Sequence, residues 1–397
     1  MIEVTAMGLI CAIGSSCEQV VESLKNVTKD SMVRKDDLLV QGKSSFFGTI
    51  KTTLPTIDPQ FKAHDSRNNR VLLHALNQIK DQVDSAIERY GHDRIGVILG
   101  TTTSGLEESD KLLSAQVQGK SYDDFSFAAQ ELGDGSLFLS QYLKLTGPAY
   151  TISTACSSSA RAIISAMRLI SGGVIDAAIV GGADTLCRMP INGFDSLESL
   201  SYDICRPFSA KRDGINIGEA GGLVLLEKQG SNLNITKDHL LIVGAGESSD
   251  SYHISAPHPQ GIGAIEAMNM ALSQANLKPS DIGYVNTHGT ATILNDKVES
   301  LAINSVLGNQ VPCSSMKYLL GHTLGAAGIC EAIISLLMLK YDVPLVVQNC
   351  SADQIDSELS DCAIVTKEGQ AIKSKYIMSN SFAFGGNNVS LILSMVN

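Results

Sequence analysis

The sequence predicts an α/β protein built from layered sheets. Short apolar segments typical of buried strands alternate with segments typical of helices along the whole chain. No linker, low-complexity segment or long charge run divides the 397 residues. Two octapeptides match at five of eight positions, AIISAMRL at 162–169 and AIISLLML at 332–339. The recurrence is either a chance match between two buried helices or the mark of a duplicated fold.

In the first half of the chain, an apolar strand is expected at 2–9. Apolar residues recur at helical spacing across 71–90, which predicts one amphipathic helix. Further strands are predicted at 94–100, 176–182 and 221–227. Residues 176–182 are apolar enough to be buried on both faces of a sheet.

In the second half, strands are predicted at 239–244, 282–285 and 390–395. The two segments that carry the octapeptide are rich in Ala, Ser and Ile and poor in charge. This composition suits helices that are covered on all sides.

Composition narrows the class of protein. Hydrophobic residues make up 44% and charged residues 18%, enough for a large core and not typical of disorder. A net charge of −11 disfavours nucleic-acid binding. Nine cysteines without a CxxC pair indicate reduced thiols and a cytoplasmic protein. No apolar run approaches a membrane span, and the apolar start of the chain is better explained as a strand than as a signal peptide.

A candidate nucleophile, Cys156, follows the turn signal Gly147-Pro148 and opens the first repeated helix. Free N–H groups and the positive end of the helix dipole favour a thiolate over a thiol at such a position. An isolated cysteine is, however, more often a small buried hydrophobe.

Two histidines stand in segments that favour an active site. His288 lies in THGT directly after the strand predicted at 282–285, where a side chain can face a cleft. His322 lies in KYLLGHTLGAAG, whose small residues let backbones approach closely before the second repeated helix. Each histidine alone could instead be structural.

An acid, Glu331, lies inside the otherwise apolar second repeated helix. A buried carboxylate needs a partner, and Lys317 is the natural candidate. The alternative is that Glu331 lies on a solvent-exposed face of the helix.

Near the C-terminus, NSFAFGGNN at 380–388 indicates a tight turn after two phenylalanines. This turn is either functional or an ordinary turn whose two phenylalanines belong to the core.

Together, the four segments resemble the β-ketoacyl-[acyl carrier protein] synthases of type I and II. These enzymes show TACSS, THGT, KxxxGHxxGAAG and NSFxFGG in this order, and the resemblance extends to 206–214 and 249–253. It covers essentially the whole chain. A finer similarity is to ketosynthases of aryl-polyene biosynthesis, a type II polyketide route.

The resemblance implies the thiolase fold, a duplicated five-layer αβαβα structure. It implies an N-terminal half at 1–237 that carries the nucleophile and a C-terminal half at 238–397 that carries both histidines. The implied reaction is decarboxylative Claisen condensation of an acyl thioester with malonyl carrier, with neither a cofactor nor a metal.

The resemblance also implies a role for each site residue. Cys156 would take the acyl chain, and His288 and His322 would promote decarboxylation of the malonyl unit. Lys317 and Glu331 would form the charged support. The backbone N–H groups of Cys156 and Phe384 would form an oxyanion hole, and Phe384 would also be the gate.

The implied partners are acyl- and malonyl-loaded carrier proteins and a second subunit, either identical or a chain-length-factor-like homologue. Residues 176–182 are suited to extend a sheet across a two-fold axis. Carrier proteins are acidic, so a local basic patch is expected, and Lys62, Arg67 and Arg70 are the candidates. The alternative for these three is a solvated helix end.

The chain departs from the family pattern at three places. The family usually has a Pro and a Gly between THGT and the next Asp, whereas the run here is Ile293-Leu294-Asn295-Asp296. Ala383 replaces a Gly of the gate loop, and Asn387 replaces a Thr. A Cβ at position 383 is expected to stiffen the gate, because glycine tolerates positive φ more readily. The departures leave housekeeping fatty-acid elongation open as an alternative role. Cys156 argues against a non-catalytic chain-length-factor-like subunit.

Overall fold

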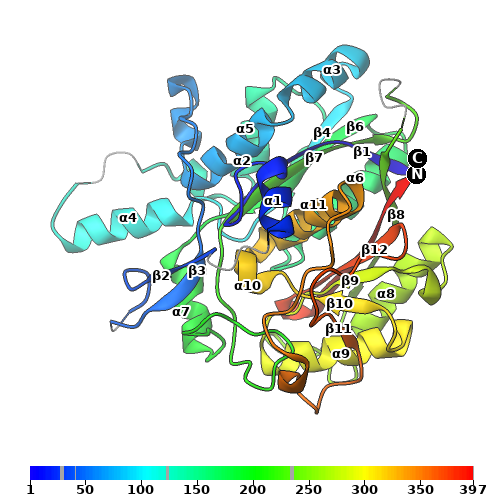
Figure 1. Ribbon diagram of the computed structural model, residues 1–397. Coiled ribbons are helices and arrows are strands. Elements are labelled where there is room, and N and C mark those ends of the chain that lie inside the picture. The colour runs from blue at the N-terminus through cyan, green and yellow to red at the C-terminus, as the bar shows by residue number, and fades with distance from the viewer. Residues whose placement is uncertain (27–30, 41, 122–124, 233–236, 397) are drawn as a thin grey trace.

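Five layers build the protein, helices over sheet over helices over sheet over helices, as the thiolase fold requires (Figure 1). The computed structural model describes residues 1–26, 31–40, 42–121, 125–232 and 237–396. Two central helices lie between the sheets. The outer layers are α2 (Arg67–Asn77), α3 (Lys80–Tyr90) and α5 (Asp134–Tyr142) on one side, and α8 (Ile262–Ala275) and α9 (Ile293–Leu307) on the other.

The first sheet has the strand order β1-β7-β6-β4-β5. β4 runs parallel to β5 and β6, whereas β7 runs antiparallel to β6 and β1. Its strands are β1 (Ile2–Ile10), β4 (Ile95–Gly100), β5 (Ala149–Ile152), β6 (Ala177–Asp184) and β7 (Ala220–Lys228).

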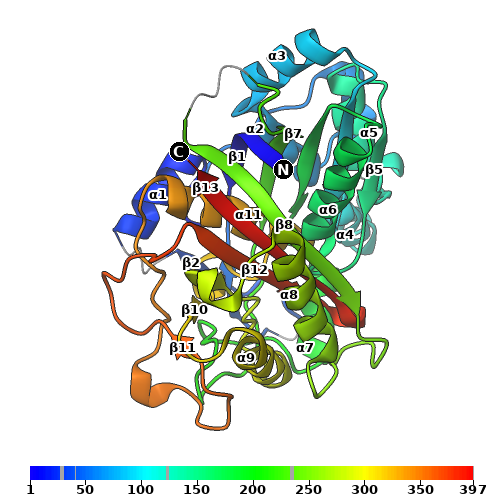
Figure 2. The ribbon, with the colours of Figure 1, turned by 90° about the vertical axis from the view of Figure 1, so that its right-hand side faces the viewer.

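The second sheet repeats this arrangement as β8-β13-β12-β9-β10, with β11 added at the edge. β9 runs parallel to β10 and β12, and β13 runs antiparallel to β12 and β8. A short pairing of β1 with β8 joins the two sheets, and Figure 2 shows α8 lying across β8. The strands are β8 (His239–Ser249), β9 (Tyr284–Asn286), β10 (Pro312–Ser314), β11 (Ala363–Ile364), β12 (Tyr376–Phe382) and β13 (Asn387–Val396).

The recurring octapeptides lie in equivalent helices, α6 (Ser158–Ser171) and α11 (Ala327–Lys340). The duplicated thiolase fold expected from the resemblance is therefore confirmed, and the match is not due to chance. The division at 237/238 falls between β7 and β8, and its position stays a prediction.

The two central helices touch through their backbones. A Cβ on Gly328 would lie 2.7 Å from the backbone nitrogen of Ala160, so only glycine fits there. A hydrogen bond also joins the two helices, from the backbone N–H of Ile329 to Ser159 Oγ at 2.9 Å. The start of α11 is thereby fixed against the start of α6.

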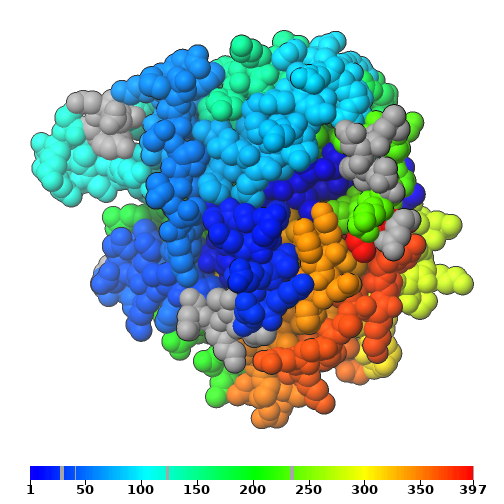
Figure 3. All heavy atoms as spheres, turned by 45° about the horizontal axis from the view of Figure 1, so that its top comes forward, coloured from blue at the N-terminus to red at the C-terminus, as the bar shows by residue number. Residues whose placement is uncertain are grey.

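The remaining helices and strands lie outside these five layers. Figure 3 shows α4 (Leu106–Val117) projecting from the body of the molecule, and none of its residues is buried. No helix of the described residues is long and apolar enough to cross a membrane. The other helices and strands are α1 (Cys17–Lys25), β2 (Met32–Lys35), β3 (Ser45–Gly48), α7 (Arg188–Ser196) and α10 (Lys317–Leu320), with 3₁₀ helices at Pro59–His64, Ala128–Gln130, Pro279–Asp281, Leu324–Ala326, Ala352–Gln354 and Phe384–Gly386.

Two sequence predictions about these elements were wrong. Residues 71–90 form two helices, because the backbone leaves the helical conformation at Ile79, with φ of −120° and ψ of 10°. Beside this break, the side chain of Gln78 bonds both main-chain groups of Leu9 on β1. The strand predicted at 176–182 cannot extend a sheet to a partner, because β6 already pairs with β4 on one side and β7 on the other. The exposed edge of that sheet is β5.

The close helix crossing predicts a specific loss of stability. Gly328→Ala should lower the free energy of unfolding by about 1–3 kcal/mol, because the added methyl group meets backbone that cannot move aside. Gly193→Ala, in α7, is the matched control, since a Cβ there meets nothing within 4 Å and alanine favours the helix. Urea titration of both variants measures the difference, and equal stability would contradict the assigned contact.

Candidate active site

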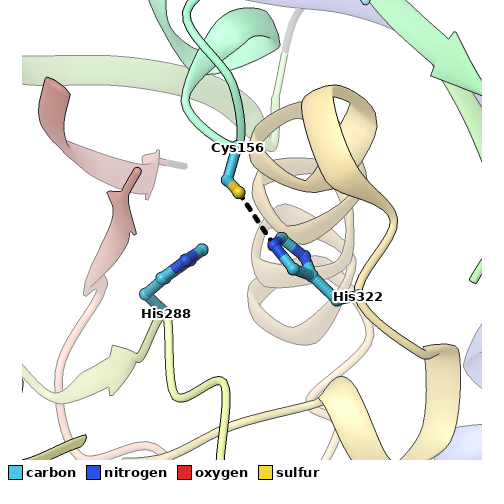
Figure 4. Close-up of side chains that lie close together, drawn as sticks. All are labelled: Cys156, His288 and His322. Carbon is cyan, nitrogen blue, oxygen red and sulfur yellow. Dashed lines mark hydrogen bonds between the residues drawn. The ribbon is translucent and has the colours of Figure 1, made fainter. Parts of the chain in front are cut away.

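Three side chains from distant segments meet in one cavity (Figure 4). Cys156 precedes α6, His288 follows β9, and His322 lies between α10 and α11. His322 Nε2 and Cys156 Sγ are 2.9 Å apart. The two imidazole rings meet edge to face, with centroids 5.3 Å apart. Segments that the sequence singled out separately therefore form one site.

Cys156 sits on a sharp turn. Ala155 adopts the left-handed conformation, with φ of 51°. The Ser158 hydroxyl accepts from the Thr154 N–H and donates to the Ala155 carbonyl, while the Ser157 hydroxyl donates to the Thr154 carbonyl. These short polar side chains stabilise the turn. The thiol is thus held at the point where the chain enters α6.

The thiol is not a preformed thiolate. Burial raises the pKa of Cys156 to about 12, while Lys317 and the backbone amides of Phe384 and Cys156 act in the opposite direction. The amide at the helix start lowers the pKa of Cys156, as the sequence predicted, but desolvation raises it by more. The two amides that act on Sγ are nevertheless those expected for the oxyanion hole.

Both histidines are uncharged at neutral pH. Burial lowers the pKa of His288 and of His322 well below the usual value, and the positive charge of Lys317 lowers both further. A neutral imidazole has one nitrogen that donates and one that accepts. It can therefore take a proton from a thiol or donate a hydrogen bond to a carbonyl oxygen.

The ion pair predicted from the sequence forms. Lys317 Nζ lies 2.7 Å from Glu331 Oε1, and both side chains are almost fully buried. The other carboxylate oxygen accepts from the Asn286 side chain at 3.2 Å. A solvated Glu331 is therefore excluded. The positive charge of Lys317 lies near both histidines, and the carboxylate of Glu331 offsets it.

Sequence inspection missed a second buried acid, Glu299 on α9. Its two oxygens accept the backbone N–H groups of His288 and Gly289, at 2.8 and 2.7 Å. Burial raises the pKa of Glu299 to about 7, although both amides lower it. Glu299 therefore holds the loop that carries His288. No local signal marked Glu299, because it stands in a polar stretch of α9 beside Asp296, Lys297 and Ser300.

The gate loop connects β12 to β13. The Phe384 ring packs on Phe194, with centroids 5.6 Å apart. Gly385 and Gly386 have φ of 79° and 76°, whereas Ala383 has φ of −106°. The backbone cost expected for alanine at position 383 is therefore absent, and the two glycines carry the conformations that require them.

The site opens into a cavity of about 210 Å³. Its walls combine apolar side chains with a few hydroxyl and acidic groups, and Ile293 and Leu294 are among the apolar ones. The lining includes Cys156, His288 and His322 with Phe194, Ile215, Thr290, Thr292, Ile293, Leu294, Phe382 and Phe384. The cavity provides a path to the thiol for an extended apolar or amide-containing chain.

The same three side chains are the one group, among the described residues, spaced closely enough to share a metal ion. Their ligand atoms lie within 4.8 Å of one another. The direct contact between the thiol and His322 is the arrangement that acyl transfer requires. That the protein works without cofactor or metal stays a prediction.

The proposed carrier-binding residues lie at a separate polar cleft of about 520 Å³, lined by Lys62, Arg67 and Arg70. Arg67 donates to both oxygens of Glu219, at 2.9 and 2.7 Å. Arg70 donates to both oxygens of Asp65. These carboxylates offset much of the positive charge that the sequence suggested. Carrier binding at this cleft stays a prediction.

Comparison with known proteins identifies the family. The N-terminal domain of β-ketoacyl synthases matches residues 1–231, and the C-terminal domain matches 239–350. The chain is 31% identical to 3-oxoacyl-[acyl-carrier-protein] synthase 1 of Haemophilus influenzae, covering 99% of this chain and 98% of that protein. It is 36% identical to synthase 2 of Rhizobium meliloti over 262 residues, 63% of this chain and 61% of that protein.

A solved structure agrees with these matches. The ketosynthase ApeO, in complex with its chain length factor ApeC from Xenorhabdus doucetiae, is 51% identical, with a TM-score of 0.95 over 100% of this chain and 98% of that one. The order of segments, the duplicated fold and the cysteine beside two histidines all agree with this similarity. The chain belongs to the β-ketoacyl synthase family of acyltransferases.

Proposed function

We propose that the protein condenses an acyl group, held on Cys156, with a malonyl unit presented by an acyl carrier protein. The observation that carries this proposal is the 2.9 Å contact between Cys156 Sγ and His322 Nε2, with His288 facing the same cavity. This arrangement serves two successive half-reactions.

In the first half-reaction, Cys156 attacks the thioester carbonyl of the acyl carrier. His322 accepts the thiol proton as the bond between sulfur and carbon forms. The backbone N–H groups of Cys156 and Phe384 hold the developing oxyanion. The carrier thiolate then leaves and takes up the proton, so that the acyl group remains on Cys156.

In the second half-reaction, the malonyl thioester enters the same cavity. The uncharged imidazoles of His288 and His322 donate hydrogen bonds to its thioester oxygen as the carboxylate leaves as carbon dioxide. For this step His322 carries its proton on Nε2, so it takes the other tautomer from the one that accepts the thiol proton in the first half-reaction. The resulting enolate carbon attacks the acyl carbon on Cys156, and the thiolate leaves. Burial, assisted by the positive charge of Lys317, lowers the pKa of both histidines and keeps them neutral for this step.

The finer assignment is to aryl-polyene biosynthesis rather than housekeeping fatty-acid elongation. The sequence resemblance and the 51% identity to ApeO support it. By the same similarity, we propose a second subunit of the chain-length-factor type. The exposed edge of β5 and the exposed apolar residues Leu113 and Val117 of α4 are surfaces that such a subunit can cover. We propose the cytoplasm as location, where the nine free thiols stay reduced.

The two half-reactions should separate on mutation. Cys156→Ala should abolish self-acylation yet retain slow release of carbon dioxide from malonyl carrier, since both imidazoles remain. His288→Ala should keep some acylation and lose about 10² to 10³ in decarboxylation rate, because one donor to the oxyanion is removed. Labelled carbon dioxide release and intact-mass detection of acyl-enzyme measure the two steps. Full acylation of the Cys156→Ala protein would refute the nucleophile assignment.

The pH dependence of alkylation tests the state of the thiol. With the pKa of Cys156 at about 12, the thiolate fraction grows about tenfold per pH unit below that value. Iodoacetamide labelling of Cys156 should therefore accelerate from pH 7 to pH 10 without a plateau. The Cys156→Ala protein corrects for the other thiols. A plateau below pH 8 would instead indicate a preformed thiolate paired with a charged histidine.

The choice of acyl chain tests the pathway. A conjugated aryl-polyenyl carrier thioester should be elongated faster than a saturated chain of equal length, if the aryl-polyene assignment that rests on the similarity to ApeO holds. Steady-state rates with both carriers, measured with and without a chain-length-factor-like subunit, decide the matter. Faster elongation of the saturated chain, both with and without the second subunit, would instead support a role in fatty-acid elongation.

A further inference from the structure

The gate loop is fastened to the body of the protein on two sides. The Gly385 N–H donates to the Ile254 carbonyl at 2.8 Å, and the Asn388 side chain donates to Asp250 at 2.8 Å. On the opposite side, Asn387 Oδ1 accepts from Arg161 Nη1 at 3.0 Å. Asn387 is the position where this chain departs from the usual threonine, and the reaction described above does not use it.

Arg161 belongs to the nucleophile helix. It lies in the first turns of α6, five residues after Cys156. Its Nε donates to Glu247 on β8 at 2.9 Å, while its Nη1 reaches Asn387. The guanidinium of Arg161 therefore bonds two partners at once, the carboxylate of Glu247 and the side chain of Asn387. Asn387 is the first residue of β13 and directly follows the gate loop. A threonine hydroxyl lies one bond closer to its own backbone than an asparagine oxygen and reaches less far.

Glu247 makes this anchor firm. It also accepts from Arg168 Nη2 at 2.7 Å, about two helical turns further along α6. Partial burial alone would raise the pKa of Glu247, but the two guanidiniums lower it below its usual value. The carboxylate is therefore charged at neutral pH, and Arg161 is held by a charge-assisted hydrogen bond on one side while it binds Asn387 on the other.

We propose that Arg161 and Asn387 are positioning residues that set the geometry of the oxyanion hole. One donor of the hole, the Cys156 amide, stands at the start of α6, and the other, the Phe384 amide, stands in the gate loop from the opposite half of the chain. The bond from Arg161 to Asn387 links these two elements directly. It holds the Phe384 amide at a constant distance from Cys156.

This inference rests on the proposed acyl transfer to Cys156, but not on the aryl-polyene assignment. The chain supplies a matched control in Arg168, which binds Glu247 as Arg161 does and has no described contact with the gate loop. A purely structural role for the cluster would make the two arginines equivalent. If Arg161 instead positions the gate loop, only the substitution of Arg161, which binds Asn387, should slow the acylation of Cys156.

The experiment measures self-acylation of Cys156 by a saturated acyl carrier, followed by intact mass, at several carrier concentrations. Asn387→Ala should lower the maximal acylation rate about tenfold, with little change in the carrier concentration needed for half-maximal rate and in Tm. Asn387→Asp, whose carboxylate still accepts from Arg161, should recover the rate to within about threefold of wild type. Arg168→Ala should acylate at the wild-type rate.

Arg161→Lys is the second variant, for use if Asn387→Ala does not fold. Its ammonium can pair with Glu247 but cannot bind both partners as the fork does, so a similar loss of maximal rate is expected. Equal rates for Asn387→Ala and wild type, equal losses for Arg168→Ala, or no recovery with Asn387→Asp would each overturn the inference. Failure of the wild type to acylate would instead overturn the proposed function.

Discussion

The crossing of α6 and α11 is the contact on which the active site depends. Cys156 and His322 each stand just before one of these helices, so the separation of the helix starts sets the separation of thiol and imidazole. Gly328 lets the two backbones meet, and the bond from Ile329 to Ser159 fixes their register. Backbone contacts adjust less than side-chain contacts do, which makes this geometry durable.

The same packing explains the electrostatics. The helices and sheets around the site exclude water, and desolvation then raises the pKa of Cys156 and lowers that of both histidines. The result is a neutral thiol beside neutral imidazoles, with the charge of Lys317 matched by Glu331. Such a site keeps little net charge before substrate arrives, and its fixed N–H groups become effective only as an oxyanion develops.

Local patterns predicted much of this arrangement. Cys156, His288, His322 and the Lys317–Glu331 pair each stand in a segment with a recognisable composition, and the repeated octapeptide marked both central helices. The errors arose where the tertiary structure decides. The helix expected at 71–90 is interrupted at Ile79, beside a Gln78 side chain that bonds a strand 69 residues earlier in the chain, and β6 is an interior strand because β4 and β7 flank it. Glu299 and the link from Arg161 to Asn387 also join segments that no local pattern connects.

The sequence by itself determined the α/β fold class and the segments that carry the candidate site residues, because these follow from local periodicity and residue type. The role of Cys156 as nucleophile came from the resemblance to a known family and not from the local pattern. Only the tertiary structure decided the protonation states, the edge strand open to a partner and the anchoring of the gate loop. Desolvation depends on every layer that covers the thiol, whatever its distance in sequence. A hydrogen bond such as that from Arg161 to Asn387 spans 226 residues and exists only once both halves of the fold have packed together.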